Sequence, residues 1–339
     1  MKKSTYSVAV VGASGLVGAE IVTVLAERQF PLADLRLYAS ARSAGDEVRC
    51  GRLRARIELL EGARFTDTDL VFLAAGEQIS AEWVGRATEH GAVVIDCSQL
   101  LADDADVPLV VPEVNAADVA GFRSRGAVTS PDAPAIALAV ALKPLEVAVG
   151  IARLVATTFE PVAGAGRAGL DELQQQTLAL MSGQSAEERV FPQRIAFNVL
   201  PQVGELLAGG VSRDEQQTID ALRRLLGTPE LTASVTRARV PLFFGGAVSA
   251  NIETTHPLPA AQTRELLHGA PGVLLEDTAA EPRYATPADA VGQDATLVGR
   301  IREIPSANAV DLWIAFDNIR KGSAVNAVQI AEILVRDHL

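Results

Sequence analysis

A short apolar run that leads directly into a glycine-rich turn near the N-terminus is the strongest constraint on the fold. Residues 8–11 are mostly valine, and the turn at residues 12–18 has G-x-x-G-x-x-G spacing. The following segment, 16–28, has apolar residues at helical spacing. This order predicts a strand, a tight turn and a helix, in which backbone N–H groups can contact a pyrophosphate. The turn therefore predicts a dinucleotide site, with a plain strand-to-helix turn as the alternative.

The same alternation continues along the N-terminal part of the chain. Apolar runs predict strands at 35–38, 70–73 and 92–95, and a helix at 81–90. Strands that alternate with helices imply a parallel sheet with right-handed crossovers.

The pattern changes near residue 130, which indicates a second, mixed α/β domain. The sequence predicts helices at 133–142 and in the first part of 167–197, strands at 154–160, 232–239 and 247–254, and an amphipathic C-terminal helix at 324–339. Trp83 and Trp313 lie in helix and strand patterns, so we expect both in the core.

Composition excludes several classes of protein. A chain of 339 residues with 48% hydrophobic and 21% charged residues is globular and long enough for two domains. Two cysteines, Cys50 and Cys97, are too few for a disulfide framework or a multi-cysteine metal cluster. The net charge of −12 repels nucleic acid and anionic membranes, and no run of 18 apolar residues occurs. We expect a soluble cytoplasmic protein that binds no nucleic acid, membrane or metal.

A polar tetrapeptide, residues 40–43, follows the second predicted strand and indicates which dinucleotide the chain would bind. An acidic residue at this place would bind a ribose 2′-hydroxyl, whereas Arg42, flanked by Ser40 and Ser43, suits a 2′-phosphate. The segment favours NADP (NADPH) over NAD, with an ordinary polar loop as the alternative.

Seven stretches in one order resemble the aspartate-semialdehyde dehydrogenase family over nearly the whole chain. They are residues 12–18, 40–45, 107–115, 164–169, 197–202, 298–303 and 317–322. The resemblance implies a function in amino-acid biosynthesis and an assembly that is a homodimer or a higher oligomer. It also implies an N-terminal Rossmann-type parallel sheet that binds NADP, at 1–130 and completed by the C-terminal helix 320–339. The second domain, at 131–319, would be a mixed α/β (α+β) dimerisation domain.

The turn, the tetrapeptide and the resemblance together give a set of expected cofactor-binding residues. The set is Gly12, Ala13, Ser14, Gly15, Leu16, Val17, Ser40, Arg42, Ser43, Ala75, Gly76, Ala163, Gly164 and Asn318.

The catalytic residues that the resemblance implies are not in place. In the family a cysteine thiolate at the start of a helix attacks the aldehyde, hydride passes to NADP, and phosphate cleaves the thioester. The matching position here is Ala133, which has no nucleophilic atom, and the position of the family's histidine base is Gly246. No catalytic residue of the family is therefore expected to be intact.

The anion-binding positions of the family are also changed. A glutamine that orients the acyl group matches Glu160, a phosphate-binding arginine matches Ala102, and a lysine matches Gln217. Arg239 remains of this set. We expect Arg239 and Glu160 to face a substrate, with a small anionic ligand as one possibility.

Three functions stay open from the sequence. The first is an NADP-binding protein without ordinary dehydrogenase activity, acting as a sensor or as a partner of an active relative. The second is an NADP-dependent oxidoreductase that acts on an aldehyde or oxo group with altered chemistry, using Glu160 as a base or Cys97 as a nucleophile. The third is a non-catalytic, dimeric interaction protein.

Overall fold

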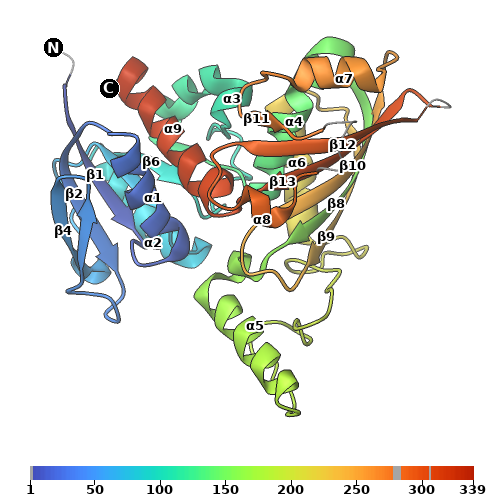
Figure 1. The fold of residues 1–339 in the computed structure, drawn as a ribbon. Helices are drawn as coiled ribbons and strands as arrows, with labels where there is room; N and C mark the ends of the chain where they lie inside the picture. Colours follow the sequence, from blue (N-terminus) through green and yellow to red (C-terminus); the bar gives the residue numbers. More distant parts are fainter. Residues whose placement is uncertain (1–2, 278–283, 305–306) are drawn as a thin grey trace. The chain divides into compact units, whose positions relative to one another are not determined.

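The chain folds into two compact units, which Figure 1 shows as a ribbon. The computed structural model describes residues 3–277, 284–304 and 307–339. Unit 1 comprises Met1–Asp132 and Ser323–Leu339, and unit 2 comprises Ala133–Gly322. None of the described helices is long and apolar enough to cross a membrane.

Unit 1 is built on a seven-stranded sheet with the order β3-β4-β2-β1-β5-β6-β7. Neighbouring strands are parallel except in the β3–β4 hairpin. Its strands are β1 (Tyr6–Val11), β2 (Leu32–Ala39), β3 (Glu47–Cys50), β4 (Leu53–Leu59), β5 (Leu70–Leu73), β6 (Val93–Asp96) and β7 (Ala127–Thr129). Its α-helices are α1 (Leu16–Glu27), α2 (Glu77–Glu89), α3 (Pro112–Asn115) and α9 (Asn326–Ile333).

Side chains on both faces of this sheet are buried, which explains why its central strands are continuous apolar runs. Val8 and Val10 of β1 join a core cluster with residues of α1 and α9, whereas Ala9 and Val11 join a second cluster with Phe65 and α2. The Rossmann-type parallel sheet predicted from the sequence is therefore confirmed.

The C-terminal helix predicted at 324–339 is also confirmed. Helix α9 continues into a π-helical turn at Leu334–His338, and it follows another at Arg320–Val325. Its apolar residues lie in the same core cluster as α1, so this remote segment completes unit 1.

Unit 2 contains a six-stranded mixed sheet with the order β11-β12-β13-β10-β8-β9. Its strands are β8 (Ile151–Glu160), β9 (Thr232–Arg239), β10 (Gly246–Thr254), β11 (Val273–Leu275), β12 (Thr296–Ile304) and β13 (Ala309–Phe316). Its α-helices are α4 (Ala133–Val149), α5 (Gly166–Met181), α6 (Arg213–Leu226), α7 (Ala260–Leu267) and α8 (Pro287–Ala290).

Helices α4, α6 and α7 pack on one face of this sheet (Figure 1). Along β8, Leu154, Ala156 and Thr158 are buried, whereas Val155 and Thr157 between them are partly exposed. Burial that alternates from one residue to the next is typical of a strand whose sheet is covered by helices on one face only. The mixed α/β second domain is therefore confirmed.

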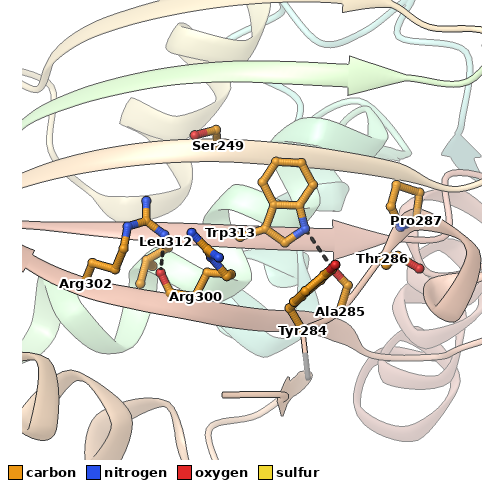
Figure 2. A pocket seen from close by; sticks show the side chains of 9 residues that line it. All are labelled: Ser249, Tyr284, Ala285, Thr286, Pro287, Arg300, Arg302, Leu312 and Trp313. Carbon is orange, nitrogen blue, oxygen red and sulfur yellow. Dashed lines mark hydrogen bonds between the residues drawn. The ribbon is translucent and has the colours of Figure 1, made fainter. Parts of the chain in front are cut away.

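Two features of the fold differ from the expectation. The β3–β4 hairpin at the edge of the first sheet was not predicted, because its sequence is rich in arginine and glutamate. The expectation that both tryptophans are core residues is confirmed for Trp83 and wrong for Trp313, which is only partly buried and lines a pocket (Figure 2). Trp313 lies on the same face of the sheet as its register partner Ser249, which is exposed.

The side chain of Asn326 connects α9 to the rest of unit 1. Its amide nitrogen donates to the Val110 carbonyl at 3.0 Å and to Ser130 Oγ at 2.8 Å, and the residue is fully buried. Asn326→Ala would leave both acceptors unpaired in the core. We expect the free energy of unfolding to fall by about 2 kcal/mol or more, measured by urea denaturation.

Gln329→Ala is the matched control on the same helix. Gln329 is half-buried, and its amide nitrogen donates a hydrogen bond to Glu113 Oε1 at 2.8 Å. A loss of stability in this control as large as that of Asn326→Ala would contradict the assignment.

Candidate functional site

The turn between β1 and α1 requires glycine at two positions because backbone segments approach each other closely. Gly12 has φ +86°, and a Cβ there would lie 2.6 Å from the Ala74 carbonyl oxygen. A Cβ on Gly18 would lie 2.2 Å from the Gly12 carbonyl oxygen. The Gly12 N–H donates to the Tyr38 carbonyl at 2.9 Å, which ties the turn to β2. These contacts place the start of α1 directly above the end of β1.

The predicted nucleotide-binding segments of unit 1 meet at one edge of its sheet. Strands β2, β1 and β5 are neighbours and parallel, so their carboxyl ends lie side by side. The N-cap of α1 is Gly15, which has no side chain to occupy the first N–H groups of the helix, and its first turn has no acidic residue. Such a helix start attracts an anion. The expected residues at this edge are Gly12, Ala13, Ser14, Gly15, Leu16, Val17, Ser40, Arg42, Ser43, Ala75 and Gly76.

Arg42 lies in the turn that follows β2. The Ser43 N–H donates to the Ser40 carbonyl at 3.0 Å, which closes this turn. Ser40 and Arg42 are exposed and Ser43 is half-buried. A guanidinium flanked by hydroxyl groups is therefore displayed at the ribose end of the expected nucleotide path.

The other three expected cofactor residues lie in unit 2. Ala163 and Gly164 belong to a short 3-10 helix at Val162–Ala165, directly after β8. A Cβ on Gly164 would lie 2.5 Å from Nη1 of Arg239, so a side chain there would require the guanidinium to shift. Asn318 is mostly buried, and its Oδ1 accepts a hydrogen bond from the Gly245 N–H at 3.2 Å.

Close contacts lie near Ala133, which is partly exposed, and near Gly246, which is buried, the two positions expected to match the family's nucleophile and base. Ala133 opens α4, and a Cβ on Gly322 would lie 2.4 Å from the Ala133 methyl carbon. Gly246 opens β10, and a Cβ there would lie 2.7 Å from the Phe316 ring and 3.1 Å from the Phe159 carbonyl oxygen. A side chain at Gly246 therefore requires the Phe316 ring to move.

Glu160, at the end of β8, forms a buried ion pair with Arg237 of β9. Arg237 Nε donates to Glu160 Oε1 at 2.6 Å, and Arg237 Nη2 donates to Glu160 Oε2 at 2.9 Å. Thr158 Oγ1 donates to the same carboxylate at 2.7 Å. Both partners of the ion pair are about 5% exposed. This two-pronged geometry is the strongest that arginine and a carboxylate can adopt.

Helix α6 supports Arg237 from the other side. Arg237 Nη1 donates to the Asp214 carbonyl at 3.2 Å and to Thr218 Oγ1 at 3.1 Å, and the Arg237 N–H donates to Glu215 Oε1 at 3.1 Å. Gln217, which is expected to match a lysine of the family, lies on the same helix and is half-buried.

Arg239 lies beside this pair, with its Nη1 at 3.7 Å from Glu160 Oε2. The same nitrogen donates to the Pro161 carbonyl at 2.8 Å. The structure therefore brings Glu160 and Arg239 together, as expected, and adds Arg237, which the sequence analysis did not identify. The available signal was the two-residue spacing of Arg237 and Arg239, which places both on one face of a strand.

The charge of Glu160 is fixed by these neighbours. Burial alone would raise the pKa of the Glu160 carboxyl, but the charge and hydrogen bonds of Arg237, together with Arg239 and Thr158, hold that pKa below its usual range. A carboxylate so held is a poor proton acceptor near neutral pH.

Two further positions lie in unit 1, after β6. Cys97 is half-buried, and burial together with the adjacent Asp96 raises the pKa of its thiol far above the ordinary range. A thiol with a raised pKa supplies little thiolate, which is the nucleophilic form. Ala102, which is expected to match a phosphate-binding arginine of the family, donates its N–H to the Gln99 carbonyl at 3.2 Å.

Comparisons with known proteins agree with the order of the two units. Residues 7–122 match the family described as semialdehyde dehydrogenase, NAD binding domain, and residues 142–321 match semialdehyde dehydrogenase, dimerisation domain. The chain is 40% identical to aspartate-semialdehyde dehydrogenase 2 of Vibrio cholerae, over 98% of each chain. It is also 40% identical to the aspartate-semialdehyde dehydrogenase of Rickettsia conorii, over 98% of this chain and 99% of the relative.

Solved structures give the same result. The crystal structure of aspartate semialdehyde dehydrogenase II from Vibrio cholerae, complexed with ASA, has a TM-score of 0.96 and 40% identity and covers 99% of this chain and 100% of that one. A probable aspartate-semialdehyde dehydrogenase from Pseudomonas aeruginosa has a TM-score of 0.93 and 36% identity, at the same coverage. With both domains matched in order and relatives similar over almost the whole chain, this chain belongs to the aspartate-semialdehyde dehydrogenase family.

Proposed function

We propose that this protein is an NADP-binding member of its family that lacks the ordinary dehydrogenase activity. The single observation that carries the proposal is the buried Glu160–Arg237 ion pair. It occupies the place where the family has a neutral glutamine facing the acyl group, and both of its charged groups are already satisfied by each other.

The nucleotide half of the proposal is supported by unit 1. The close approaches at Gly12 and Gly18 give the turn the geometry that a pyrophosphate site needs. Arg42 supplies a positive charge in the turn after β2, where a 2′-phosphate of NADP would bind. We also propose that residues 1–130 with 320–339 form the NADP-binding domain and 131–319 the dimerisation domain of a homodimer or higher oligomer.

The loss of activity follows from the residue types at the reacting positions. An alanine at position 133 cannot form a thiohemiacetal, and a glycine at position 246 cannot accept a proton. Removing a covalent nucleophile costs on the order of a millionfold in kcat in the well-measured protease case. Charge-assisted hydrogen bonds, lost with Ala102 and Gln217, are each worth roughly 1.5–3 kcal/mol.

The alternative of altered redox chemistry finds less support. Glu160 is held as a carboxylate by Arg237 and Arg239, and the Cys97 thiol has a raised pKa. Neither group has the properties of an activated base or nucleophile.

The first prediction concerns the cofactor. Arg42→Ala should weaken NADPH binding about tenfold or more, because a charged contact to the 2′-phosphate is lost, and should leave NADH binding nearly unchanged. Isothermal titration calorimetry measures both affinities. Arg52→Ala, an exposed arginine in the β3–β4 hairpin, is the control. Equal affinity of the wild type for NADH and NADPH would contradict the assignment of Arg42.

The second prediction concerns the ion pair. Glu160→Gln leaves Arg237 buried without its carboxylate and should lower the free energy of unfolding by about 3–5 kcal/mol. Adding Arg237→Met to the same chain should restore part of that loss, because the Arg237 charge is then removed, while Arg239 still lacks the Glu160 carboxylate. Chemical denaturation of the wild type, Glu160→Gln, Arg237→Met and the double variant gives the interaction free energy between the two side chains. Additive losses in the double variant would show that the two side chains do not act as a pair.

The same pair predicts a dependence on pH. Because the folded-state pKa of Glu160 is lowered, its contribution to stability is complete above the ordinary pKa of glutamate. It is lost as the pH falls through the lowered value. The wild type should therefore lose this part of its stability on acidification, whereas the double variant should not.

The third prediction concerns catalysis. The wild type should show no phosphate-dependent reduction of NADP with aspartate semialdehyde, assayed beside the Vibrio cholerae relative. A variant with Ala133→Cys, Gly246→His, Glu160→Gln and Ala102→Arg should stay inactive, because Phe316 obstructs position 246 and Arg237 loses its partner. Wild-type turnover within about a thousandfold of the relative would refute the proposal.

A further inference from the structure

The turn that contains Arg42 is connected to β4, the strand beside β2 in the sheet of unit 1 (Figure 1). The two strands are parallel, and Ala39, the last residue of β2, is paired with Leu59, the last residue of β4. The turn at residues 40–45 therefore begins next to the carboxyl-terminal half of β4. Side chains in this half of β4 can contact the segment that is expected to bind the 2′-phosphate.

Two backbone hydrogen bonds attach the end of the turn to one residue of β4. The Gly45 N–H donates to the Ile57 carbonyl at 2.8 Å, and the Ile57 N–H donates to the Asp46 carbonyl at 2.9 Å. Ile57 is buried in the core cluster that includes residues of α1, so its position is fixed by the packing of unit 1. The end of the turn is thereby held to the sheet.

A third hydrogen bond to the turn comes from the side chain of Arg56. Its Nε donates to the Gly45 carbonyl at 2.9 Å. Gly45 has φ +101°, which L side chains rarely adopt, whereas a Cβ there would meet no atom within 4 Å. Glycine is therefore suited to this position by its backbone conformation, and in that conformation its carbonyl accepts the Arg56 bond.

The direction of the Arg42 side chain depends on the backbone of this turn. The Ser43 N–H donates to the Ser40 carbonyl at 3.0 Å, and the Asp46 N–H donates to the Ser43 carbonyl at 3.3 Å. Among residues 3–277, 284–304 and 307–339, no hydrogen bond or ion pair of the exposed Arg42 guanidinium is found. Bonds that hold the turn, including the one from Arg56 to Gly45, therefore decide where this guanidinium can reach.

Arg54 provides an internal comparison on the same strand. Because Ile57 faces the core with α1, Arg56 lies on the opposite face of β4, and Arg54, two residues earlier, shares that face. Both arginines are exposed. Charged side chains near the edge of a sheet commonly prevent pairing with other strands, and that role would apply equally to both. The bond to the Gly45 carbonyl distinguishes Arg56 from Arg54.

We propose that Arg56 is a positioning residue for the selection of NADP over NAD. By holding the Gly45 carbonyl, its guanidinium fixes the turn from which Arg42 reaches the 2′-phosphate. A segment that is already ordered loses less conformational freedom on binding, so the affinity for the phosphorylated dinucleotide rises. NADH lacks the 2′-phosphate, so its affinity does not depend on this arrangement. The role of Arg56 rests on the proposed function, because it requires that Arg42 binds NADP.

Isothermal titration calorimetry of two variants of Arg56, with NADPH and with NADH, tests the proposal. Arg56→Met removes the donor and should weaken NADPH binding about fivefold, with NADH binding nearly unchanged. Arg56→Gln removes the charge but keeps a nitrogen donor at the same number of bonds from Cα as Nε. Because the bond to Gly45 can still form, this variant should bind NADPH within about twofold of the wild type.

Arg54→Met is the matched control, since it removes an exposed charge from the same face of β4 and no bond to the turn. It should leave the affinity for NADPH within about twofold of the wild type, because exposed charges are screened by salt. Equal losses in Arg56→Met and Arg56→Gln would overturn the proposal, because the charge and not the bond would then matter. A loss in Arg54→Met as large as that in Arg56→Met would overturn it for the same reason.

The two nucleotides separate a failure of this proposal from a failure of the proposed function. If the wild type prefers NADPH and Arg56→Met keeps the full preference, or loses affinity for NADH and NADPH equally, the role of Arg56 alone is refuted. If the wild type binds neither nucleotide, or binds both equally, the assignment of Arg42 is refuted and the role of Arg56 with it.

Discussion

The buried ion pair between Glu160 and Arg237 is the interaction on which the interpretation of unit 2 depends. A lone carboxylate at the end of β8 would be strongly destabilised by burial, and a lone guanidinium in β9 equally so. Together they satisfy each other through two hydrogen bonds, and Thr158 and α6 satisfy the remaining groups. The buried negative charge of Glu160 is therefore tolerated because its counter-charge lies on the neighbouring strand.

This pairing has consequences for the neighbouring residues. Arg239 shares the Glu160 carboxylate at 3.7 Å and also donates to a backbone carbonyl, so its charge is partly used within the protein. The first turn of α6 supports Arg237, through Asp214 and Glu215. The guanidinium groups of Arg237 and Arg239 are thus bonded to groups within the protein. They are not preorganised to bind an external anion.

How far the sequence predicts the structure depends on how local each feature is. The β1–α1 turn was predictable because Gly12 and Gly18 encode it within one short segment. Arg237 was missed because its partner lies 77 positions earlier in the chain and meets it only through the β8–β9 register. Trp313 was misassigned because strand periodicity does not say which face of the sheet is covered by helices.

Substitutions at Ala133, Glu160 and Gly246 would disturb the surrounding structure to different extents. Replacing Ala133 by cysteine adds one sulfur atom and changes no buried charge. Replacing Glu160 by glutamine leaves Arg237 as an uncompensated cation in the core, and a histidine at Gly246 must displace the Phe316 ring. Packing around Gly246 and charge balance around Glu160 therefore depend on the residues now present, so a substitution at either position is expected to lower stability unless its neighbours change too.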